Sequence, residues 1–344
     1  MNKSWLRAAV VANIVAIALL AGFVLTKAYP SSEAVRLRNA LILDVGADPD
    51  FNWTPHEPPA DYLMERRKPL PEFVADAQRV AGDSVHGDWP KALALAAMLT
   101  KNARRVGPIQ ANLYSTYRAI LDEGRGYCAD YVDAYLALSH AAGLPVRVWA
   151  FSFDGFGGHG HAFVEVFDGL RQKWLFLDVF NNVHAIDATT GEPLSAIEFR
   201  EFALGKREAP IIRRNGPSRL GFSIESKLVD YYRRGAAEWY LWWGNAIYSY
   251  DAHPAVRVAD RVSYSLGQLT AIVVGVHPRI KVLATPENMA QVQRMVRLRW
   301  TLLLITALVF ALSIILTWQI FFGRRVSAKA ERNRPEQPRF QSRG

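Results

Sequence analysis

The chain has 344 residues, with 41 Lys and Arg against 32 Asp and Glu, a formal net charge of +9, and a single cysteine. One cysteine excludes an intramolecular disulfide framework, and a charge of this size would ordinarily suggest a nucleic-acid or acidic partner. Residues 279–344 alone hold 12 Lys and Arg against 3 Glu, which leaves 29 basic and 29 acidic residues elsewhere. The excess is therefore local, and we expect no nucleic-acid partner.

The N-terminal segment, residues 8–26, is a 19-residue apolar stretch interrupted only by Asn13 before it ends at Thr26. At about 1.5 Å of rise per residue, a helix of this length covers about 28 Å, close to the thickness of a hydrocarbon core. A cleaved signal peptide is the alternative, because Lys3 and Arg7 precede the stretch. The stretch exceeds the usual signal-peptide core and lacks a small-residue cleavage site, so we predict an uncleaved anchor over residues 1–27.

Residues 28–72 are rich in Pro, Asp and Glu and are predicted to form an extended linker with one short strand around Leu41–Val45. From Pro71, apolar residues recur at helical spacing over Phe73–Val80 and again over Ala92–Leu99. Two further helices are predicted, and they are separated by Gly124 and Gly126 and cover Ala111–Leu121 and Cys128–Ala142.

Three strand-like runs follow these helices, over Val146–Phe153, His161–Phe167 and Trp174–Phe180. A short helix is predicted from Ser195 to Leu204. Helices followed by consecutive strands favour an α+β fold over a doubly wound sheet. We therefore predict one α+β domain over residues 73–215.

Residues 216–298 are predicted to form an accessory region in which Leu228–Tyr250 is dense in Trp and Tyr. Such density is typical of a carbohydrate platform, of a membrane-interface belt, or of packing against the core. A second membrane span is predicted over residues 299–323, because the 23 residues Trp300–Phe322 would cover about 34 Å as a helix.

The remaining residues, 324–344, form a basic tail that we predict to be disordered and cytoplasmic. Lys3 and Arg7 place the N-terminus on the same side. The predicted topology has both termini in the cytoplasm and residues 28–298 outside it.

Cys128 stands at the start of a predicted helix, where unpaired N–H groups and the positive end of the helix dipole favour a thiolate over a thiol. The same N–H groups can hold the oxyanion of a tetrahedral intermediate. Gly124 and Gly126 allow a substrate backbone to approach closely. Cys128 is therefore a candidate nucleophile, and the alternative is a small buried hydrophobe.

His161 and Asp178 lie on two strands that the short segment 168–173 joins. Side chains of like parity share a face, so a hairpin with Phe167 opposite Trp174 places His161 diagonal to Asp178. Diagonal partners are about 7 to 8 Å apart at Cα, within reach of a His–Asp hydrogen bond. A one-residue slip would send the two side chains to opposite faces, so the pattern permits the pair without fixing the register. The order Cys, His, Asp is the one that a thiol nucleophile with an oriented base needs.

These segments resemble the transglutaminase-like superfamily. The resemblance rests on Gly126-x-Cys128 opening a helix, on Gly143-Leu144-Pro145-Val146-Arg147, on His161-Ala162-Phe163-Val164-Glu165 and on Trp174-x-x-x-Asp178. It covers roughly residues 85–190 and points to the bacterial membrane-tethered members. It implies a papain-like core in which the helix carrying Cys128 packs on an antiparallel sheet carrying His161 and Asp178. It also implies that Cys128 is the nucleophile, His161 the base and Asp178 the group that orients the imidazole, with no cofactor and no metal.

Two of these residues have rivals nearby in the sequence. His159 shares a strand face with His161 but lies in a glycine-rich segment, 157–160, that is predicted to be a mobile loop. Asn181 and Asn182 compete with Asp178, because papain-type enzymes use Asn in that role. A metal site made of His159, His161 and Asp178 is disfavoured by its spacing. We interpret three further residues as structural: Asp130, Trp149 and Glu165.

The sequence therefore predicts a membrane-anchored cysteine-dependent hydrolase or acyltransferase, such as a cysteine protease or amidase. Its substrate would be a protein, peptide or peptidoglycan-type amide on the periplasmic side of a bacterial inner membrane. The alternative is a non-catalytic envelope scaffold that retains the fold and binds polysaccharide or partner proteins through the aromatic segment 231–250.

Overall fold

A six-stranded sheet lies at the centre of the computed structural model, which describes residues 3–28, 31–44, 50–104, 107–216 and 225–332. The strand order is β1-β8-β7-β2-β3-β4, in which β1 is parallel to β8 and the other neighbours are antiparallel. The strands are β1 (Leu43–Asp44), β8 (Arg279–Val282), β7 (Glu238–Trp243), β2 (Val146–Ser152), β3 (Gly160–Asp168) and β4 (Lys173–Leu177). A separate antiparallel pair is formed by β5 (Val183–Ile186) and β6 (Ile211–Arg214).

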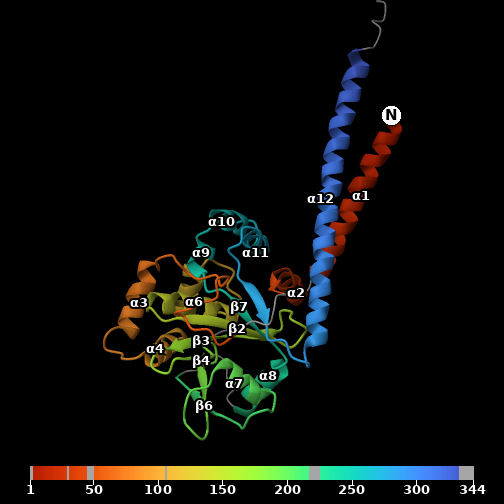
Figure 1. Ribbon diagram of the computed structural model, residues 1–344. Coiled ribbons are helices and arrows are strands. Elements are labelled where there is room, and N and C mark those ends of the chain that lie inside the picture. Colours follow the sequence, from red (N-terminus) through yellow and green to blue (C-terminus); the bar gives the residue numbers. More distant parts are fainter. Residues whose placement is uncertain (1–2, 29–30, 45–49, 105–106, 217–224, 333–344) are drawn as a thin grey trace, which may run out of the picture.

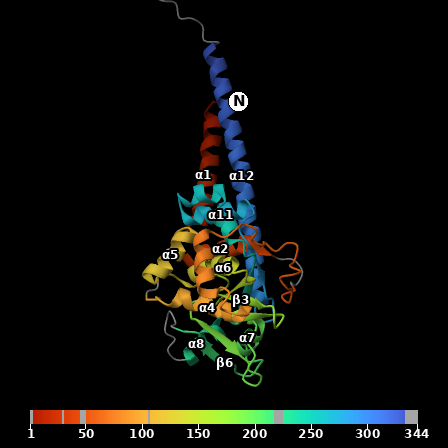
Figure 2. The same cartoon turned by 90° about the vertical axis from the view of Figure 1, so that its left-hand side faces the viewer.

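Helices cover both faces of this sheet (Figures 1 and 2). One face carries α3 (Pro71–Ala81), α4 (Asp88–Thr100), α5 (Leu113–Glu123) and α6 (Cys128–Ala141), and the other carries α7 (Ala196–Ala203) and α8 (Glu225–Gly235). Because both faces are covered, every residue of β2 is buried. The remaining helices are α1 (Lys3–Ala28), α2 (Ser31–Ile42), α9 (Ile247–Asp251), α10 (Pro254–Asp260), α11 (Tyr264–Val273) and α12 (Met289–Arg332).

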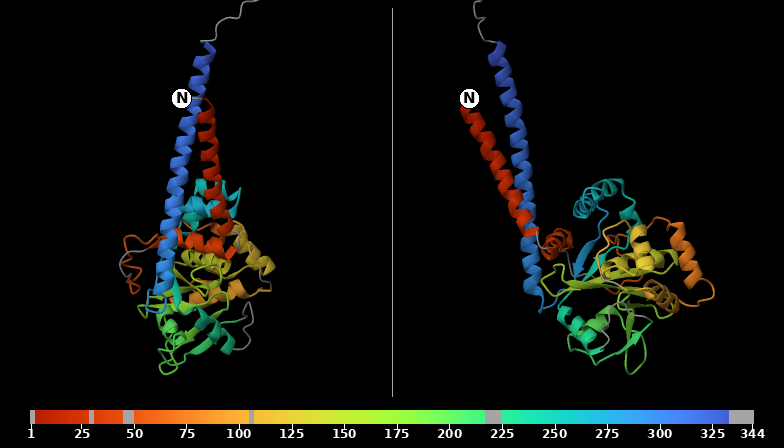
Figure 3. Two further views of the ribbon diagram at one scale, coloured as in Figure 1. Left: turned by 90° about the vertical axis from the view of Figure 1, so that its right-hand side faces the viewer. Right: turned by 180° about the vertical axis from the view of Figure 1, so that it is seen from behind.

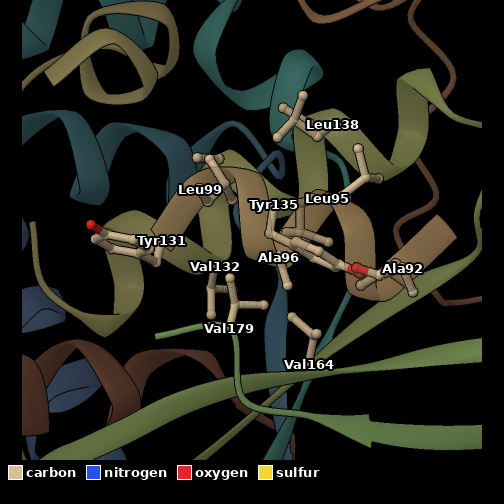
Figure 4. Close-up of a cluster of buried hydrophobic side chains, with 14 of the residues drawn as sticks. Ala92, Leu95, Ala96, Leu99, Tyr131, Val132, Tyr135, Leu138, Val164 and Val179 are labelled. Atoms are coloured by element: carbon tan, nitrogen blue, oxygen red, sulfur yellow. The ribbon is translucent and has the colours of Figure 1, made fainter. Parts of the chain in front are cut away.

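The core between α4, α6 and the sheet is aliphatic and tightly interlocked, as Figure 4 shows. Leu95 and Leu99 of α4 lie beside Val132 of α6, above Val164 of β3. The phenol of Tyr135 donates a hydrogen bond to the Ala92 carbonyl at 3.0 Å, which satisfies its one polar atom inside this cluster. This packing fixes the axis of α6 on the sheet, and Cys128 is the first residue of that helix.

A buried ion pair and a set of aromatic rings fill the opposite face. Glu165 of β3 accepts from the Arg147 guanidinium at 2.6 Å and from the Trp149 indole N–H at 2.5 Å, and its other oxygen accepts from the Ala196 N–H at 2.7 Å. Arg147 also donates to the Phe51 carbonyl at 2.6 Å. Glu165 and Trp149 are therefore structural groups in this core.

The predicted α+β fold is confirmed. The helices predicted around Phe73, Ala92, Ala111–Leu121, Cys128–Ala142 and Ser195–Leu204 are present as α3, α4, α5, α6 and α7, within one to two residues where bounds were predicted. The three predicted strands are β2, β3 and β4, and Phe167 lies opposite Trp174 in the β3–β4 ladder. The predicted hairpin register is therefore the observed one.

The segment predicted to be an extended linker, residues 28–72, differs in the structure. It contains the helix α2, and Phe51, Trp53 and Tyr62 are buried in the aromatic core. The short strand predicted around Leu41–Val45 is present as β1 over Leu43–Asp44. The Trp53 carbonyl accepts from the Trp174 indole at 2.7 Å. The segment is therefore rich in Pro and acidic residues, yet its buried aromatic side chains pack on the sheet. The end of the predicted short strand, Val45, lies outside the described residues.

The region predicted to be accessory, residues 216–298, supplies β7 and β8 to the central sheet, with β7 directly beside β2. Its aromatic residues mostly form core: Tyr232, Trp239, Tyr240, Trp243 and Tyr248 are buried. Core packing, one of the three interpretations of this segment, therefore holds for most of these rings, and an exposed platform that includes Trp239 and Trp243 is not formed.

The two apolar helices leave the domain side by side, as Figures 1 and 3 show. Both are long and apolar enough to cross a membrane, over Ser4–Lys27 and within Met289–Phe322. The Asn13 amide donates to the Leu312 carbonyl at 3.1 Å, which joins α1 to α12 midway along the predicted spans. Helix α12 continues to Arg332, beyond the predicted start of disorder, because Ala, Lys, Glu and Arg at 328–332 are good helix formers. Residues 333–344 of the predicted tail lie outside the described residues.

We expect Glu165→Gln to lower the free energy of unfolding by about 3 to 5 kcal/mol, because the substitution leaves the buried Arg147 without its counter-charge. Burial already lowers the pKa of Arg147, and the Glu165 carboxylate is the first opposing influence. Urea denaturation in detergent, followed by tryptophan fluorescence, measures the change. Asp122→Asn is the matched control: it removes an exposed pair with Arg118 at 2.8 Å and should cost at most about 1 kcal/mol. Equal losses in the two variants would contradict the prediction.

Candidate active site

Cys128 is placed by a two-glycine turn between α5 and α6. Gly124 ends α5 with φ of 60°, and a Cβ there would lie 1.9 Å from the Asn102 carbonyl oxygen, so only glycine fits. The Tyr127 N–H then donates to Asp130 Oδ2 at 2.7 Å, which caps the first turn of α6. The first helical N–H groups, those of Cys128 and Ala129, have no acceptor within the helix. The half-buried thiol therefore sits beside free backbone donors.

His161 is the second residue of β3 and is buried. The position before His161 requires glycine, because a Cβ at Gly160 would lie 1.9 Å from the Phe151 carbonyl oxygen of the paired strand. The Nε2 atom of His161 donates to Asp178 Oδ2 at 2.7 Å, and the Cys128 side chain is among the groups that raise the pKa of the imidazole. Since Nε2 is engaged with Asp178, Nδ1 is the ring nitrogen left for the thiol.

Asp178 follows β4 directly and is held at both its backbone and its carboxylate. Its N–H donates to the Val183 carbonyl at 2.9 Å, which closes the turn after the strand. The Asn181 side-chain amide donates to Oδ2 at 2.6 Å and the Asn181 backbone N–H donates to Oδ1 at 3.0 Å. The Tyr232 hydroxyl of α8 donates to the same Oδ2. Asp178 therefore has little freedom to turn away from His161.

The surroundings favour the charged forms of both groups. Burial lowers the pKa of His161, but the Asp178 charge, the hydrogen bond to it and the Cys128 side chain together raise that pKa above its usual value. Burial raises the pKa of Asp178, but His161, Tyr232 and the Asn181 N–H outweigh this and lower it. The pair is thus an imidazolium next to a carboxylate in a site enclosed by aromatic rings.

The rivals of His161 and Asp178 lie in other environments. His159 is exposed and pairs with Asp154 at 3.1 Å, in a loop that Asp154 fixes by accepting from the Gly157 and His159 N–H groups. Asn181 supports Asp178 and does not replace it at the imidazole. Within the described ranges, no three His, Cys, Asp or Glu side chains gather in a way that could hold a metal ion.

The sequence did not point to Tyr232 and Tyr231, which belong to the site in space. Tyr232 is fully buried, and its hydroxyl donates to Asp178. The Tyr231 ring makes an edge-on contact with the His161 ring, and its hydroxyl donates to the Gly160 carbonyl at 3.0 Å. Both tyrosines belong to α8. Along the sequence, Tyr232 is 54 residues from Asp178 and Tyr231 is 71 residues from Gly160, the groups that their hydroxyls bind. The paired tyrosines within an aromatic-rich run were the only available signal.

A second set of side chains, from α2, α6, β7 and α11, shares electrostatic interactions that include Cys128. Arg38 of α2 stacks over the Trp242 ring at 5.2 Å and interacts electrostatically with Asp133 of α6 and with Tyr264 of α11. Tyr240 interacts electrostatically with both Arg38 and Cys128. Burial and the Asp130 charge raise the pKa of Asp133 to about 7.

Comparison with known proteins agrees with this geometry. Residues 76–179 match the family model of the transglutaminase-like superfamily. The chain contains a transglutaminase-like domain. The matched segment includes Cys128, His161 and Asp178, and members of this superfamily are generally cysteine-dependent acyltransferases or hydrolases. Neither a curated protein nor a solved structure matches the chain.

We expect Asp178→Asn to lower the free energy of unfolding by about 3 kcal/mol, most strongly between about pH 4 and 6.5. A lowered carboxylate pKa stabilises the fold above about pH 4, and this contribution is lost as the pH falls through the native value. A raised imidazole pKa stabilises the fold fully below about pH 6.5, and this contribution declines as the pH rises toward the native value. Urea denaturation of wild type and variant across this range measures the difference. A difference that stays constant from acid to alkaline pH would rule out the charged pair.

Proposed function

We propose that this protein is a membrane-anchored thiol enzyme that acts on amide bonds, with Cys128 as nucleophile, His161 as base and Asp178 as the group that orients the imidazole. The observation that carries the proposal is the buried imidazole that is hydrogen-bonded at Nε2 to Asp178 and whose pKa is raised by both Asp178 and the Cys128 side chain. A base held between a nucleophile and a carboxylate is the arrangement that activates a thiol.

In the first half of the reaction, the Cys128 sulfur attacks the amide carbonyl carbon and forms a tetrahedral intermediate. The N–H groups of the first turn of α6 would hold its oxyanion, since they have no acceptor in the helix. The C–N bond then breaks, and His161 gives its proton to the leaving amine. A thioester between Cys128 and the acyl group remains.

In the second half, water or a second amine attacks the thioester carbonyl. His161 takes the proton of the attacking group, the C–S bond breaks, and the thiolate returns. Water yields a carboxylic acid, and an amine yields a new amide. The substrate class is the amide of a protein, a peptide or a peptidoglycan-type chain.

The two apolar helices would anchor this domain in a bacterial inner membrane. Their lengths support two spans, and the basic residues at both chain ends support a cytoplasmic location for both termini. The domain between the spans would then act on the periplasmic side.

We expect iodoacetamide to alkylate Cys128 at near-neutral pH at least about tenfold faster in the wild type than in His161→Ala, because the variant loses the imidazolium partner of the thiolate. Mass spectrometry of the single cysteine at timed intervals gives the rate. Asp178→Asn should react more slowly than the wild type for the same reason, because the imidazole loses its charge partner.

His159→Ala is the control, since His159 is exposed and binds only Asp154 among the groups described above. Its alkylation rate should equal that of the wild type, and all variants should react equally after denaturation. If the wild type and His161→Ala react equally slowly in the folded state, the proposed activation of Cys128 is wrong.

Reporter fusions test the proposed orientation. We expect alkaline phosphatase, which is active only in the periplasm, to be inactive when fused after Gly344, and a fluorescent protein that folds in the cytoplasm to be bright at the same position. Phosphatase inserted at the exposed Leu170 turn should be active. An active phosphatase after Gly344 would overturn the orientation and would leave the chemistry of the site unaffected.

A further inference from the structure

Helices α10 and α11 form a hairpin whose exposed face is unusually apolar. Helix α11 buries its small residues Gly267 and Ala271 and exposes large ones. Leu266, Leu269 and Val273 recur at intervals of three and four residues and therefore form one stripe, which Val262 in the preceding turn extends. Their side chains are exposed, Val273 by 85% and Val262 by 76%. Val258 of α10 is a further exposed apolar side chain of the hairpin.

The α10–α11 hairpin lies on the side of the domain from which the two apolar helices leave. In Figures 1 and 3, α10 and α11 lie at the end of the domain from which α1 and α12 extend. They reach past the end of α1 that leads into α2. The hairpin that carries the stripe thus lies on the same side as α1 and α12, away from α7 and β6 at the opposite end.

The level of a membrane surface follows from the contact between α1 and α12. Asn13 meets Leu312 at 3.1 Å. Going from this contact toward the domain, α1 reaches Thr26 after thirteen residues and then Lys27. Over the same number of residues in the same direction, α12 reaches Arg299, which is next to Trp300. Both helices therefore pass from apolar to basic residues at one level, with a Trp at the boundary, as is typical of a membrane interface. The α10–α11 hairpin is drawn beside this level in Figure 3.

Charge supports a bilayer as the occupant of this face. Arg257 of α10 and Arg261 of the connecting turn are exposed next to Val258 and Val262, and with the exposed Asp260 they leave this segment with a net charge of +1. Apolar side chains flanked by arginines are characteristic of helices that lie in the headgroup region of anionic membranes. An ordinary protein partner would also cover the stripe, but it would have to fit between the domain and the membrane surface.

We infer that the α10–α11 hairpin inserts its apolar stripe into the outer leaflet and so forms a third membrane contact of the chain, an inference that rests on the proposed membrane anchoring. The hairpin is also connected to the helix that carries Cys128, because α9 directly precedes α10 and its Tyr248 hydroxyl donates to the Ala137 carbonyl of α6 at 2.9 Å. Insertion therefore holds the Cys128 helix at a fixed height against the bilayer.

The test uses the full chain in vesicles of phosphatidylcholine and phosphatidylglycerol. In a Cys128→Ser background, single cysteines replace Val262, Leu269 or Val273 and carry an environment-sensitive fluorophore. Leu304→Cys on α12 is the control inside the span, and Leu170→Cys in the β3–β4 turn, 89% exposed, is the control in water. Lipids with a nitroxide near the headgroup quench fluorophores that lie in the interface.

We expect these lipids to quench the three hairpin positions at least about threefold more than Leu170→Cys, as for a helix buried in the headgroup region. If the hairpin positions behave like Leu170→Cys while Leu304→Cys is quenched, the insertion is wrong and the anchoring stands. A blue-shifted emission at the hairpin without quenching would show a protein partner and would also overturn the insertion. If Leu304→Cys is not quenched either, the anchoring fails and the insertion with it.

Discussion

The register of strand β3 is the constraint on which the rest of the structure depends. Side chains alternate along the strand, so a shift by one residue would exchange its two faces. In the observed register, with Phe167 opposite Trp174 and Ala150 opposite Ala162, Val164 faces the helices α4 and α6. His161 and Glu165 then face the aromatic side together, one toward Asp178 and the other toward Arg147. The same alternation therefore builds the aliphatic core under α6 and brings the two buried ion pairs to the other face.

Both ion pairs are costly to bury, and the structure offsets the cost by complete hydrogen bonding. An unpaired buried charge would be strongly unfavourable, whereas a pair whose remaining lone pairs are satisfied is tolerated. Glu165 has three donors from Arg147, Trp149 and the start of α7, and Asp178 has His161, Asn181 and Tyr232. The difference between the pairs lies in access. Glu165 contacts only core groups, while His161 also contacts the half-buried Cys128, so one pair stabilises the fold and the other is available for chemistry.

Most of the site geometry could be predicted from the sequence because it is local. Cys128 follows a glycine turn, and His161 and Asp178 lie on one hairpin whose register follows from alternation over a short loop. Contacts between distant segments could not be predicted in this way. The pairing of β7 with β2 joins residues about 90 positions apart, and no local pattern fixes the partner of a strand. Tyr232 was missed for the same reason. Helix α2 was missed because the neighbouring Pro and acidic residues outweighed its own short helical pattern.

Helix α2 connects the anchors to the candidate active site. It begins three residues after α1 ends, and its Ala40 packs with Met295 and Leu302 of α12. At its other side, Ser32 donates to Asp154 at 2.5 Å and Arg36 to the Gly155 carbonyl at 3.1 Å, in the loop that leads into Gly160 and His161. Arg38 of the same helix stacks over the Trp242 ring of β7 at 5.2 Å. The two apolar helices are thus linked through α2 to the loop that precedes His161. Because these contacts are polar and packed, movement of α1 and α12 relative to the sheet would disturb the loop that precedes His161, and the two helices therefore bear on the architecture of the candidate site.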